Sequence, residues 1–344
     1  MSEIRTSVIV LAYGDEIHLT ECVAAVLDTT SEEVELIVVN NGADRAVASL
    51  PDHSRLRVLC PGSNLGYAGG CNFGAHAARG NSLIFLNSDA IVVHSAIDNL
   101  VRALADSSTG LASGNVRLAA YPERMNSAGN PVHYLGIAWA GGYGDPAASH
   151  AVVADVSSVS GAFFGVRADV WMSLGGFDDT YFAYHEDIEL SLRAWQRGWR
   201  VRFIPDAVVV HHYEFSRNPT KNYLLERNRW LTLLTVYPKD LLRWVLPAMV
   251  VFEVPLCVFA ARHGWLPAKA RSWRWLLAHR SDIASRRRAV QAMSVMRVDD
   301  FAGLLSARIE PAMIDRPPGL AVLNVMLATY WSIVLKRLRA RAAD

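Results

Sequence analysis

A carboxylate placed just after an apolar run is the first residue of this sequence that could do chemistry. Asp89 follows the run Ser82–Leu86, with only Asn87 and Ser88 between them. A continuous apolar run predicts a strand covered on both faces, and the carboxyl end of such a strand faces the ligand crevice of an α/β sheet. An aspartate after a strand more often caps a turn, so the role of Asp89 depends on the residues that join it.

Two adjacent acids stand at the start of a second segment that could do chemistry. Glu186 and Asp187 begin a helical pattern over Glu186–Arg197, directly after the aromatic, Gly-rich stretch 175–184. Acids complement the dipole at the start of a helix, and this ordinary explanation accounts fully for Glu189. It accounts only in part for Asp187, which is therefore a candidate general base.

Two histidines, His211 and His212, end the apolar run Ala207–Val210. A histidine at the end of a strand is commonly just a solvated residue. Joined to two aspartates, however, an imidazole is a suitable third metal ligand.

A glycine-rich segment, Asn64–Gly74, joins a predicted strand to a predicted helix. It has neither the GxGxxG spacing of a dinucleotide site nor the Gly-Lys-Ser/Thr ending of a P-loop, which argues against a nicotinamide-binding protein. Glycines at such a joint still let the backbone approach a phosphate or a sugar closely.

Strand and helix patterns alternate over the first 105 residues, which predicts a parallel, doubly wound α/β sheet. The predicted strands are Ser7–Ala12, Val34–Val39, Leu56–Cys60 and Ser82–Leu86, and the predicted helices are Glu16–Leu27 and Gly69–Arg79. Farther along, we expect a helix at Arg167–Leu174 and extended segments at Trp199–Ile204 and Ala207–Val210. Polar residues follow several strands and should meet at one edge of the sheet.

The chain is acidic at its front and basic at its back. Residues 1–240 hold 18 Lys and Arg against 26 Asp and Glu, whereas residues 241–344 hold 16 against 7. The basic part contains two apolar runs, Trp244–Ala261 and Gly319–Leu335. They fit segments at a membrane surface, a buried helix pair or oligomer interface, or short membrane spans. A nucleic-acid partner is not expected, because basic and apolar residues are interleaved.

The cysteines have no CxxC spacing, so we expect reduced cytosolic thiols rather than disulfides or a zinc site; they are Cys22, Cys60, Cys71 and Cys257. The first apolar run is short and Gly14-Asp15 follows it at once, which predicts a strand rather than a secretory signal.

Six blocks in this order resemble the inverting glycosyltransferases of family 2 with the GT-A fold, most closely their bacterial rhamnosyltransferase-like branch. The blocks lie in roughly residues 7–237 and read SVIVLAYG, LIVVNNGAD, SNLGYAGGCNFGAHAARG, IFLNSDAIV, SGAFFGVRADVWMSLGGFDDTYFAYHEDIELSLRAWQRGW and VVVHH. The resemblance implies a GT-A catalytic domain in residues 1–237, with a Rossmann-like, mainly parallel sheet, and an α-helical extension in residues 238–344.

The resemblance also implies roles for individual residues. Asp89 would bind the metal, in a motif whose usual first aspartate is Asn87 here, and His211 would be the second metal ligand, with His212 as its substitute. Asp187 would be the catalytic base, with Glu186 beside it. The nucleotide-sugar would contact Ala12, Tyr13, Asn40, Asn41, Asn64, Gly69, Asn72, Asn87, Ser88, Asp89, Gly161 and Ala162. Because Asn40 stands where an aspartate is usual, the nucleotide base stays open.

We therefore expect a metal-dependent inverting hexosyltransferase that uses Mn²⁺ or Mg²⁺. Its donor would be a nucleotide diphosphate-sugar, with L-rhamnosyl from a dTDP-sugar as the best match. Its acceptor would be a glycolipid or polysaccharide of the bacterial envelope, at the cytoplasmic face of the membrane. The alternatives are a galactofuranosyl or N-acetylhexosaminyl donor, and a sugar-binding protein without activity. The presence of Asp89, Asp187 and His211 together argues against the last.

Overall fold

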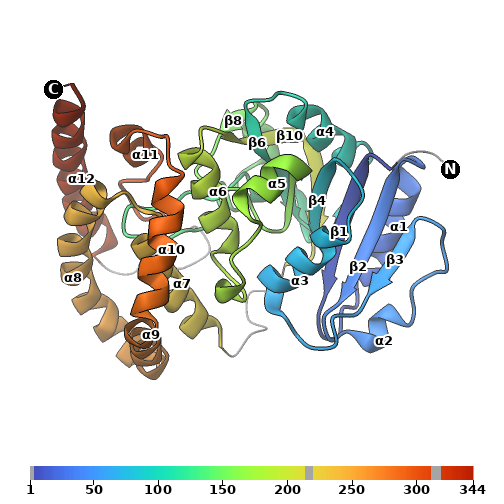
Figure 1. The fold of residues 1–344 in the computed structure, drawn as a ribbon, viewed down its shortest axis with the longest axis horizontal. Helices are drawn as coiled ribbons and strands as arrows, with labels where there is room; N and C mark the ends of the chain where they lie inside the picture. The colour runs from blue at the N-terminus through green and yellow to red at the C-terminus, as the bar shows by residue number, and fades with distance from the viewer. Residues whose placement is uncertain (1–3, 214–219, 311–318, 344) are drawn as a thin grey trace. The chain divides into compact units, whose positions relative to one another are not determined.

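A mixed sheet carries the front of the chain in the computed structural model, which describes residues 4–213, 220–310 and 319–343 (Figure 1). The strand order is β3-β2-β1-β4-β9-β6-β10-β5, with β7 beside β6 and β8 beside β10. The strands are β1 (Thr6–Ala12), β2 (Val34–Asn40), β3 (Leu56–Leu59), β4 (Ser82–Asn87), β5 (Ala90–Val92), β6 (Thr109–Leu118), β7 (Tyr121–Ser127), β8 (Ala154–Asp155), β9 (Phe163–Arg167) and β10 (Arg200–His211).

Helices accompany the sheet and then make up the back of the chain. Those interleaved with the strands are α1 (Leu19–Thr29), α2 (Asp44–Val47), α3 (Gly66–His76), α4 (Ala96–Leu104), α5 (Ala168–Leu174) and α6 (Glu186–Gln196), with 3₁₀ turns at Ala147–Ser149 and Asp179–Tyr181. Those that follow are α7 (Lys221–Val236), α8 (Lys239–Arg262), α9 (Leu266–Ala278), α10 (Arg280–Ala292), α11 (Val298–Gly303) and α12 (Leu320–Ala343). The predicted α/β fold with a mainly parallel central sheet and C-terminal helices is confirmed.

The parallel register brings the ends of three strands together. β1 pairs with β2 and with β4, so that Ala12 lies opposite Asn40 and Leu11 lies opposite Asn87. The loops that follow these strands therefore leave the sheet at one edge, as the sequence predicted. β9 then enters between β4 and β6 and runs antiparallel to both.

Both faces of β1 are covered, which explains its unbroken apolar sequence. Val8 and Val10 lie in the core cluster that includes Val23 of α1. On the other face α3 lies very close to the sheet: a Cβ added at Gly70 would meet Leu11 at 2.3 Å. Small residues in α3 therefore allow the helix to approach the sheet more closely than side chains would.

Helix α1 begins later than the sequence predicted, at Leu19 rather than Glu16. The Glu16 carboxylate accepts hydrogen bonds from the backbone N–H of Tyr13, at 3.1 Å, and from the Ser88 hydroxyl, at 2.7 Å. These bonds hold residue 16 in the loop, so apolar periodicity misplaced the start of the helix.

The two extended segments predicted at 199–204 and 207–210 form one strand, β10. Its pairing with β6 shifts register between Ile204 and Val208, around Pro205. Such an irregularity lets a strand pass a proline, which cannot donate to the ladder. Helix α3 also differs from the predicted Gly69–Arg79, since it starts at Gly66 and ends at His76.

The chain divides into two compact units. The first contains the described residues of 1–130, 140–194 and 199–215, and the second those of 131–139, 195–198 and 216–344. In the second unit, α7 packs against α9 and α10. Two helical segments there, Lys239–Arg262 and Leu320–Arg341, are long and apolar enough to cross a membrane by length and composition.

A buried carboxylate ties β2 to its surroundings in the first unit. Glu35 accepts hydrogen bonds from the Ser7 hydroxyl at 2.7 Å, from Arg57 at 2.9 Å and from the Arg79 guanidinium at 2.7 Å. Burial by itself raises the pKa of Glu35, but the bonds from Arg79, Ser7 and Arg57 outweigh it and lower the pKa from 4.5 to about 2.

We predict that Glu35→Gln lowers the free energy of unfolding by about 2–3 kcal/mol at pH 7. Because the folded-state pKa lies below the unfolded value, the stabilisation is complete above pH 4.5 and is lost as the pH falls toward 2. Urea unfolding between pH 7 and pH 3 should therefore show the free energies of unfolding of the two proteins converge as the pH falls. The same change at the exposed Glu123 should have little effect. A difference in free energy of unfolding between the wild type and Glu35→Gln that stays constant with pH would contradict the lowered pKa of Glu35.

Candidate active site

Asp187 lies buried in the first turn of α6, and its carboxylate is held by hydrogen bonds. Its Oδ2 accepts from the backbone N–H of Gly161 at 3.0 Å and from the Asn130 amide at 3.4 Å. Its Oδ1 accepts from the backbone N–H of Ile188 at 2.9 Å. These bonds fix the orientation of the group and leave lone pairs for a further proton.

The turn that delivers Asp187 is strained. Phe182, Tyr184 and His185 have φ values of 62°, 70° and 69°, in the left-handed region that such residues rarely adopt. Each such conformation costs on the order of 1–3 kcal/mol and persists only where the surroundings impose it. Gly66 contributes to this, because a Cβ there would lie 2.3 Å from the carbonyl oxygen of Phe182. The start of α3 thus fits closely against the strained turn.

Burial raises the pKa of both acids at the start of α6. For Asp187 the hydrogen bonds from Gly161 and Ile188 oppose this effect, and the pKa rises from 3.8 to about 6. For Glu186 burial and then the charge of Asp187 raise the pKa well above its ordinary value. Glu186 Oε2 has no hydrogen-bond partner among the described residues. Asp187 is therefore an acid whose conjugate base forms near neutral pH, which suits a general base.

Asp89 and His211 meet across the sheet edge. The Asp89 Oδ1 and His211 Nε2 atoms are 3.0 Å apart, and the side chains are 17% and 4% exposed. His211 Nδ1 lies 3.0 Å from the amide oxygen of Asn126, a contact that favours the tautomer with the proton on Nδ1. In that tautomer Nε2 presents a lone pair toward Asp89 and can serve as a metal ligand.

The end of β4 connects this pair to the neighbourhood of Asp187. The backbone N–H of Asn87 donates to the Ala162 carbonyl at 2.9 Å, and the Asn87 amide nitrogen lies 3.4 Å from His211 Nε2. Ala162 follows Gly161, which donates to Asp187. The structure therefore places Asn87, Asp89, Gly161, Ala162, Asp187 and His211 along one continuous set of contacts.

Asn41 and Asn64 use their side chains in hydrogen bonds within the Gly-rich joint. Buried Asn41 donates to Asn64 Oδ1 at 2.9 Å and accepts from the backbone N–H of Leu65 at 2.8 Å. Asn64 Oδ1 also accepts from the backbone N–H of Gly66 at 2.8 Å. These two asparagines hold the loop that leads into α3.

The other predicted contacts are of two kinds. Asn72 donates to the Phe177 carbonyl at 2.9 Å and to Asp179 at 2.6 Å, so it ties α3 to the segment before the strained turn. Asn40 donates to Asp44 at 2.7 Å and thereby closes the turn after β2. Tyr13, by contrast, is 59% exposed and available to a ligand. The remaining predicted positions, Ala12, Gly69 and Ser88, are buried.

Sequence patterns missed four residues that shape the site. Asn126 orients His211, Asn130 donates to Asp187, and Glu16 accepts from Ser88. The Tyr67 hydroxyl donates to the Gly161 carbonyl at 2.6 Å and so fixes the peptide that faces the base. Tyr67 lies inside the Gly-rich joint, which could have indicated it; the others carry no local signal.

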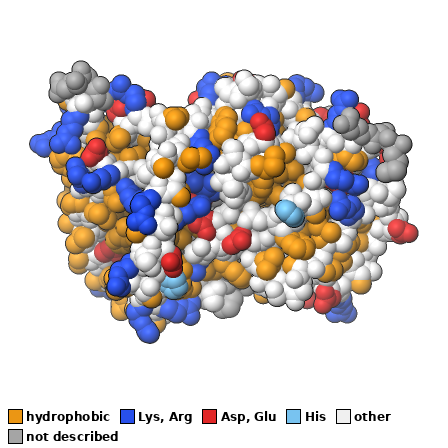
Figure 2. Space-filling model, viewed as in Figure 1, with side chains coloured by type: hydrophobic (Ala, Val, Ile, Leu, Met, Phe, Trp, Pro, Cys, Tyr) orange, Lys and Arg blue, Asp and Glu red, His pale blue; other side chains and the backbone are white. Residues whose placement is uncertain are grey.

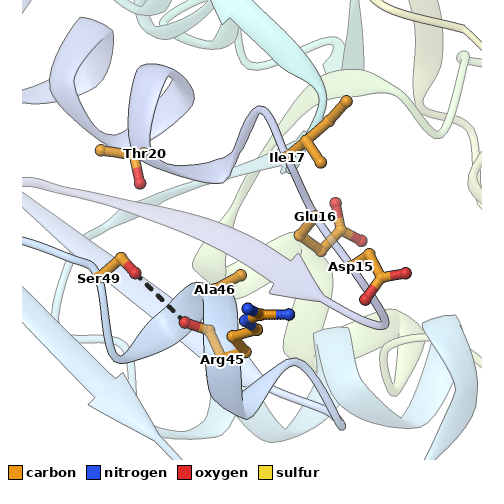
Figure 3. A pocket seen from close by; sticks show the side chains of 7 residues that line it. All are labelled: Asp15, Glu16, Ile17, Thr20, Arg45, Ala46 and Ser49. Carbon is orange, nitrogen blue, oxygen red and sulfur yellow. Dashed lines mark hydrogen bonds between the residues drawn. The ribbon is translucent and has the colours of Figure 1, made fainter.

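A surface hollow lies beside the loop that carries Tyr13 (Figure 3). Acidic and basic side chains share its wall, which is formed by Asp15, Glu16, Ile17, Thr20, Arg45, Ala46 and Ser49. Ser49 donates to the Arg45 carbonyl at 3.3 Å on one side. The predicted site residues lie outside this wall, so the hollow is a neighbour of the site rather than its centre.

Residues 4–232, well over half of the chain, match the family model described as "Glycosyltransferase like family 2", and the chain therefore belongs to this family. The resemblance inferred from the six sequence blocks is thereby confirmed. The family and the sheet described above define a glycosyltransferase with the GT-A fold.

Curated relatives give finer but shorter matches. The chain is 38% identical over 69 residues to N-acetylglucosaminyl-diphospho-decaprenol L-rhamnosyltransferase of Mycobacterium tuberculosis, which is 20% of this chain and 22% of the relative. It is 31% identical over 71 residues to Rhamnosyltransferase WbbL of Escherichia coli, 21% and 26% of the two chains. It is 23% identical over 237 residues to Probable glycosyltransferase YdaM of Bacillus subtilis, 66% and 54%. These matches span between 22% and 54% of the relatives' lengths.

Solved structures show the same fold. GalNAc-T7 with UDP, GalNAc and Mn²⁺ superposes with a TM-score of 0.58 and 14% identity, over 71% of this chain and 50% of that one. Residues 1–349 of S. aureus TarS in complex with UDP-GlcNAc superpose with a TM-score of 0.52 and 14% identity, over 98% and 92%. At this identity the likeness concerns the fold.

We predict that the free energy of unfolding of the wild type, relative to that of Asp187→Asn, rises by about 1–3 kcal/mol between pH 8 and pH 4. The folded-state pKa lies above the unfolded value, so ionised Asp187 costs stability above pH 6, and this cost disappears as the pH falls toward 3.8. Asparagine is neutral throughout. Thermal unfolding of both proteins from pH 8 to pH 4 should show the wild type gain stability relative to the variant, and a difference that stays constant with pH would contradict the raised pKa of Asp187.

Proposed function

We propose that this chain is an inverting, metal-dependent hexosyltransferase that uses a nucleotide diphosphate-sugar. The observation that carries the proposal is the environment of Asp187: a buried carboxylate, held by backbone N–H groups, with a pKa of about 6. A carboxylate that serves only as a helix cap needs neither the burial nor the strained turn before it.

In the proposed reaction Asp187 accepts the proton of the acceptor hydroxyl. The oxygen attacks the anomeric carbon on the face opposite to the diphosphate, and the bond to the diphosphate breaks as the new glycosidic bond forms. A single displacement of this kind inverts the anomeric configuration. Gly161 and Asn130 keep the carboxylate in place while it gains the proton.

The pair Asp89 and His211 fits a divalent cation, Mn²⁺ or Mg²⁺. Its ligand atoms are 3.0 Å apart, a separation that neighbouring ligands at about 2.0–2.2 Å from one ion adopt. Asn126 supplies the hydrogen bond that orients a ligating histidine. A bound cation would neutralise charge on the leaving diphosphate. The Mn²⁺ in the GalNAc-T7 complex supports this proposal.

We propose L-rhamnosyl from a dTDP-sugar as the transferred group, and a glycolipid or polysaccharide of the bacterial envelope as acceptor. Support comes from the two relatives named as rhamnosyltransferases. A galactofuranosyl or N-acetylhexosaminyl donor is the alternative, and the UDP-GlcNAc in the TarS complex favours considering it. Slow hydrolysis of donors from a panel of nucleotide-sugars with Mn²⁺ distinguishes them without an acceptor, and a non-catalytic protein would hydrolyse none.

We further propose a functional division at residue 237, with catalysis in residues 1–237 and attachment to the cytoplasmic face of the membrane in residues 238–344. Exposed apolar side chains gather on α8, namely Val250, Val251, Val254 and Val258, and on α12, namely Val322, Val325, Met326 and Ile333. Figure 2 shows hydrophobic side chains at the surface of this helical part, with Lys and Arg beside them. This combination fits an anionic lipid surface.

The opposite face of α8 argues for lying on the membrane rather than crossing it. Glu253 is buried and pairs with Arg229 and Lys269, each at 2.5 Å. Leu241, Val245 and Met249 are buried on the same side of the helix. One face of α8 is therefore buried against other helices of its own unit, and only the opposite face is available to lipid.

We predict that Asp187→Asn reduces kcat by a factor of about 10² to 10⁴ while donor affinity stays near that of the wild type, because the donor is held by other groups. In the wild type kcat/KM should fall as the pH drops below about 6, since protonated Asp187 cannot accept a proton. Stopped assays from pH 5 to pH 8, with the product configuration read by NMR, check both points.

Glu186→Gln is the matched control for Asp187→Asn, because it makes the same carboxylate-to-amide change one residue away. We expect it to keep the inflection near pH 6. If Asp187→Asn transfers sugar at the wild-type rate and Glu186→Gln is inactive, Glu186 is the base. A retained anomeric configuration would exclude single displacement altogether.

We predict that Val250→Glu with Val254→Glu weakens binding to anionic liposomes at least tenfold, because two side chains that enter the lipid are replaced by charges. Wild-type binding should also fall as salt rises. Val152→Glu is the matched control, since Val152 is 76% exposed and belongs to the first unit. Unchanged liposome binding, together with loss of a dimer in gel filtration, would make α8 an oligomer interface instead.

A further inference from the structure

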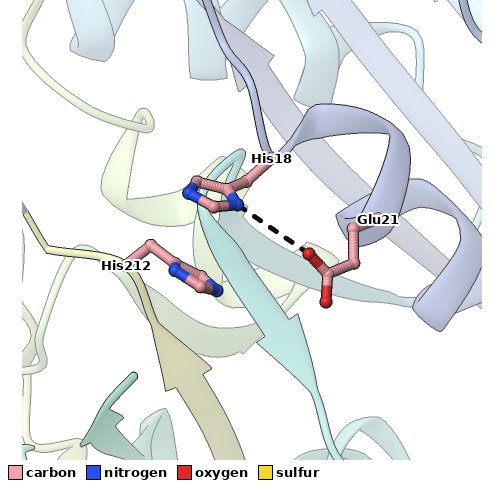
Figure 4. A group of neighbouring side chains, drawn as sticks. All are labelled: His18, Glu21 and His212. Carbon is pink, nitrogen blue, oxygen red and sulfur yellow. Dashed lines mark ion pairs between the residues drawn. The ribbon is translucent and has the colours of Figure 1, made fainter. Parts of the chain in front are cut away.

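Three metal-ligating side chains come together in the first unit without taking part in the site described above. They are His18, Glu21 and His212, and their ligand atoms all lie within 4.8 Å of one another (Figure 4). His18 and Glu21 stand at the start of α1, whereas His212 follows β10. Chain segments almost 200 residues apart therefore supply one cluster.

The rings of His18 and His212 are stacked, with centroids 3.7 Å apart and an interplanar angle of 19°. His18 Nδ1 lies 3.8 Å from Glu21 Oε2. Two stacked imidazoles cannot both be protonated without strong repulsion, so at least one offers a lone pair. Two imidazoles and a carboxylate are the ligand set that suits zinc and related transition metals.

This cluster is separate from the pair that holds Asp89. His211 directs its ring to Asp89 and Asn126, whereas the next residue, His212, directs its ring to His18. Consecutive residues of an extended chain point to opposite sides, so the two histidines serve two places. The role of substitute for His211, which the sequence resemblance gave to His212, does not match this placement of its ring.

We propose that His18, Glu21 and His212 form a second cation site, selective for Zn²⁺ or a similar transition metal over Mg²⁺. With bonds of about 2.0–2.2 Å, ligand atoms of a tetrahedral site are roughly 3.3 Å apart. Formation of such a site needs these atoms to approach by up to about 1.5 Å and the stacked rings to tilt. Glu21 is 62% exposed and His18 23%, so the side chains can move and solvent can complete the coordination.

A cation at this site would connect two loops of the catalytic unit. His18 ends the loop that carries Tyr13 and Glu16, and the backbone N–H of His212 donates to the Asp89 carbonyl at 2.9 Å. Metal binding would therefore restrain the Tyr13 loop relative to the strand end of Asp89 and His211. The inference does not depend on the reaction, because it uses neither Asp187 nor the Asp89 and His211 side chains.

The test is equilibrium dialysis and calorimetry of the full-length protein with Zn²⁺ in excess Mg²⁺. Magnesium prefers oxygen ligands and competes poorly for imidazole. We expect a Zn²⁺ site whose affinity drops at least tenfold in His18→Gln and in Glu21→Gln, as expected for loss of a ligand. Asp89→Asn should retain it. His94→Gln, at an exposed histidine outside the cluster, should equal the wild type.

Hydrogen exchange gives a readout that does not depend on activity. Zn²⁺ should slow exchange of the backbone N–H groups of residues 13–18 in the wild type and not in His18→Gln. Equal Zn²⁺ affinity in the wild type and His18→Gln would overturn the proposal. So would zinc binding that is lost in Asp89→Asn but kept in Glu21→Gln, because the metal would then lie at the other pair.

Discussion

Burying two adjacent carboxyl groups costs free energy, and the first unit supplies hydrogen bonds to both oxygens of Asp187 but leaves Oε2 of Glu186 without a partner among the described residues. The same burial raises the pKa of Asp187 to about 6, and in the proposed mechanism this makes the group basic enough to accept a proton near neutral pH. The surroundings that impose it are the strained turn and the glycine of α3 that fits against that turn. Stability and the chemistry of the base therefore oppose each other at this position.

The end of β4 leads to a second group of charged and polar side chains, the pair Asp89 and His211. Its residues place a half-buried carboxylate next to an imidazole whose Nδ1 lies beside the amide oxygen of Asn126. This arrangement of a carboxylate beside a ring nitrogen is the basis for the metal site proposed above. The backbone bond from Asn87 to Ala162 connects this pair with the segment that faces the base. Asp89 and His211 thus stand at strand ends and Asp187 at the start of α6, and the segment 161–162 connects Asp187 with the end of β4.

The sequence predicted the parallel strands because their apolar runs have a direct physical cause, burial on both faces. It also placed Asp89, His211 and Asp187 at or just beyond strand and helix ends, which is where the structure has them; their roles in chemistry stay predictions. It did not predict β9 between β4 and β6, since antiparallel insertion leaves no mark in local periodicity. Asn126 and Asn130 were missed because an asparagine that orients another side chain resembles any turn residue. Glu16 was assigned to a helix because its hydrogen bonds to Tyr13 and Ser88 come from tertiary structure.

Helix α3 lies so close to the sheet that its glycines and the strand residues below them share one space. A Cβ at Gly70 would meet Leu11 at 2.3 Å, and a Cβ at Gly74 would meet Ile9 at 2.7 Å. These positions are coupled: an alanine in the helix requires the side chain beneath it to shift or to become smaller. In diverged members of the family, substitutions at the helix and strand positions should therefore occur together, with the summed side-chain volume nearly constant.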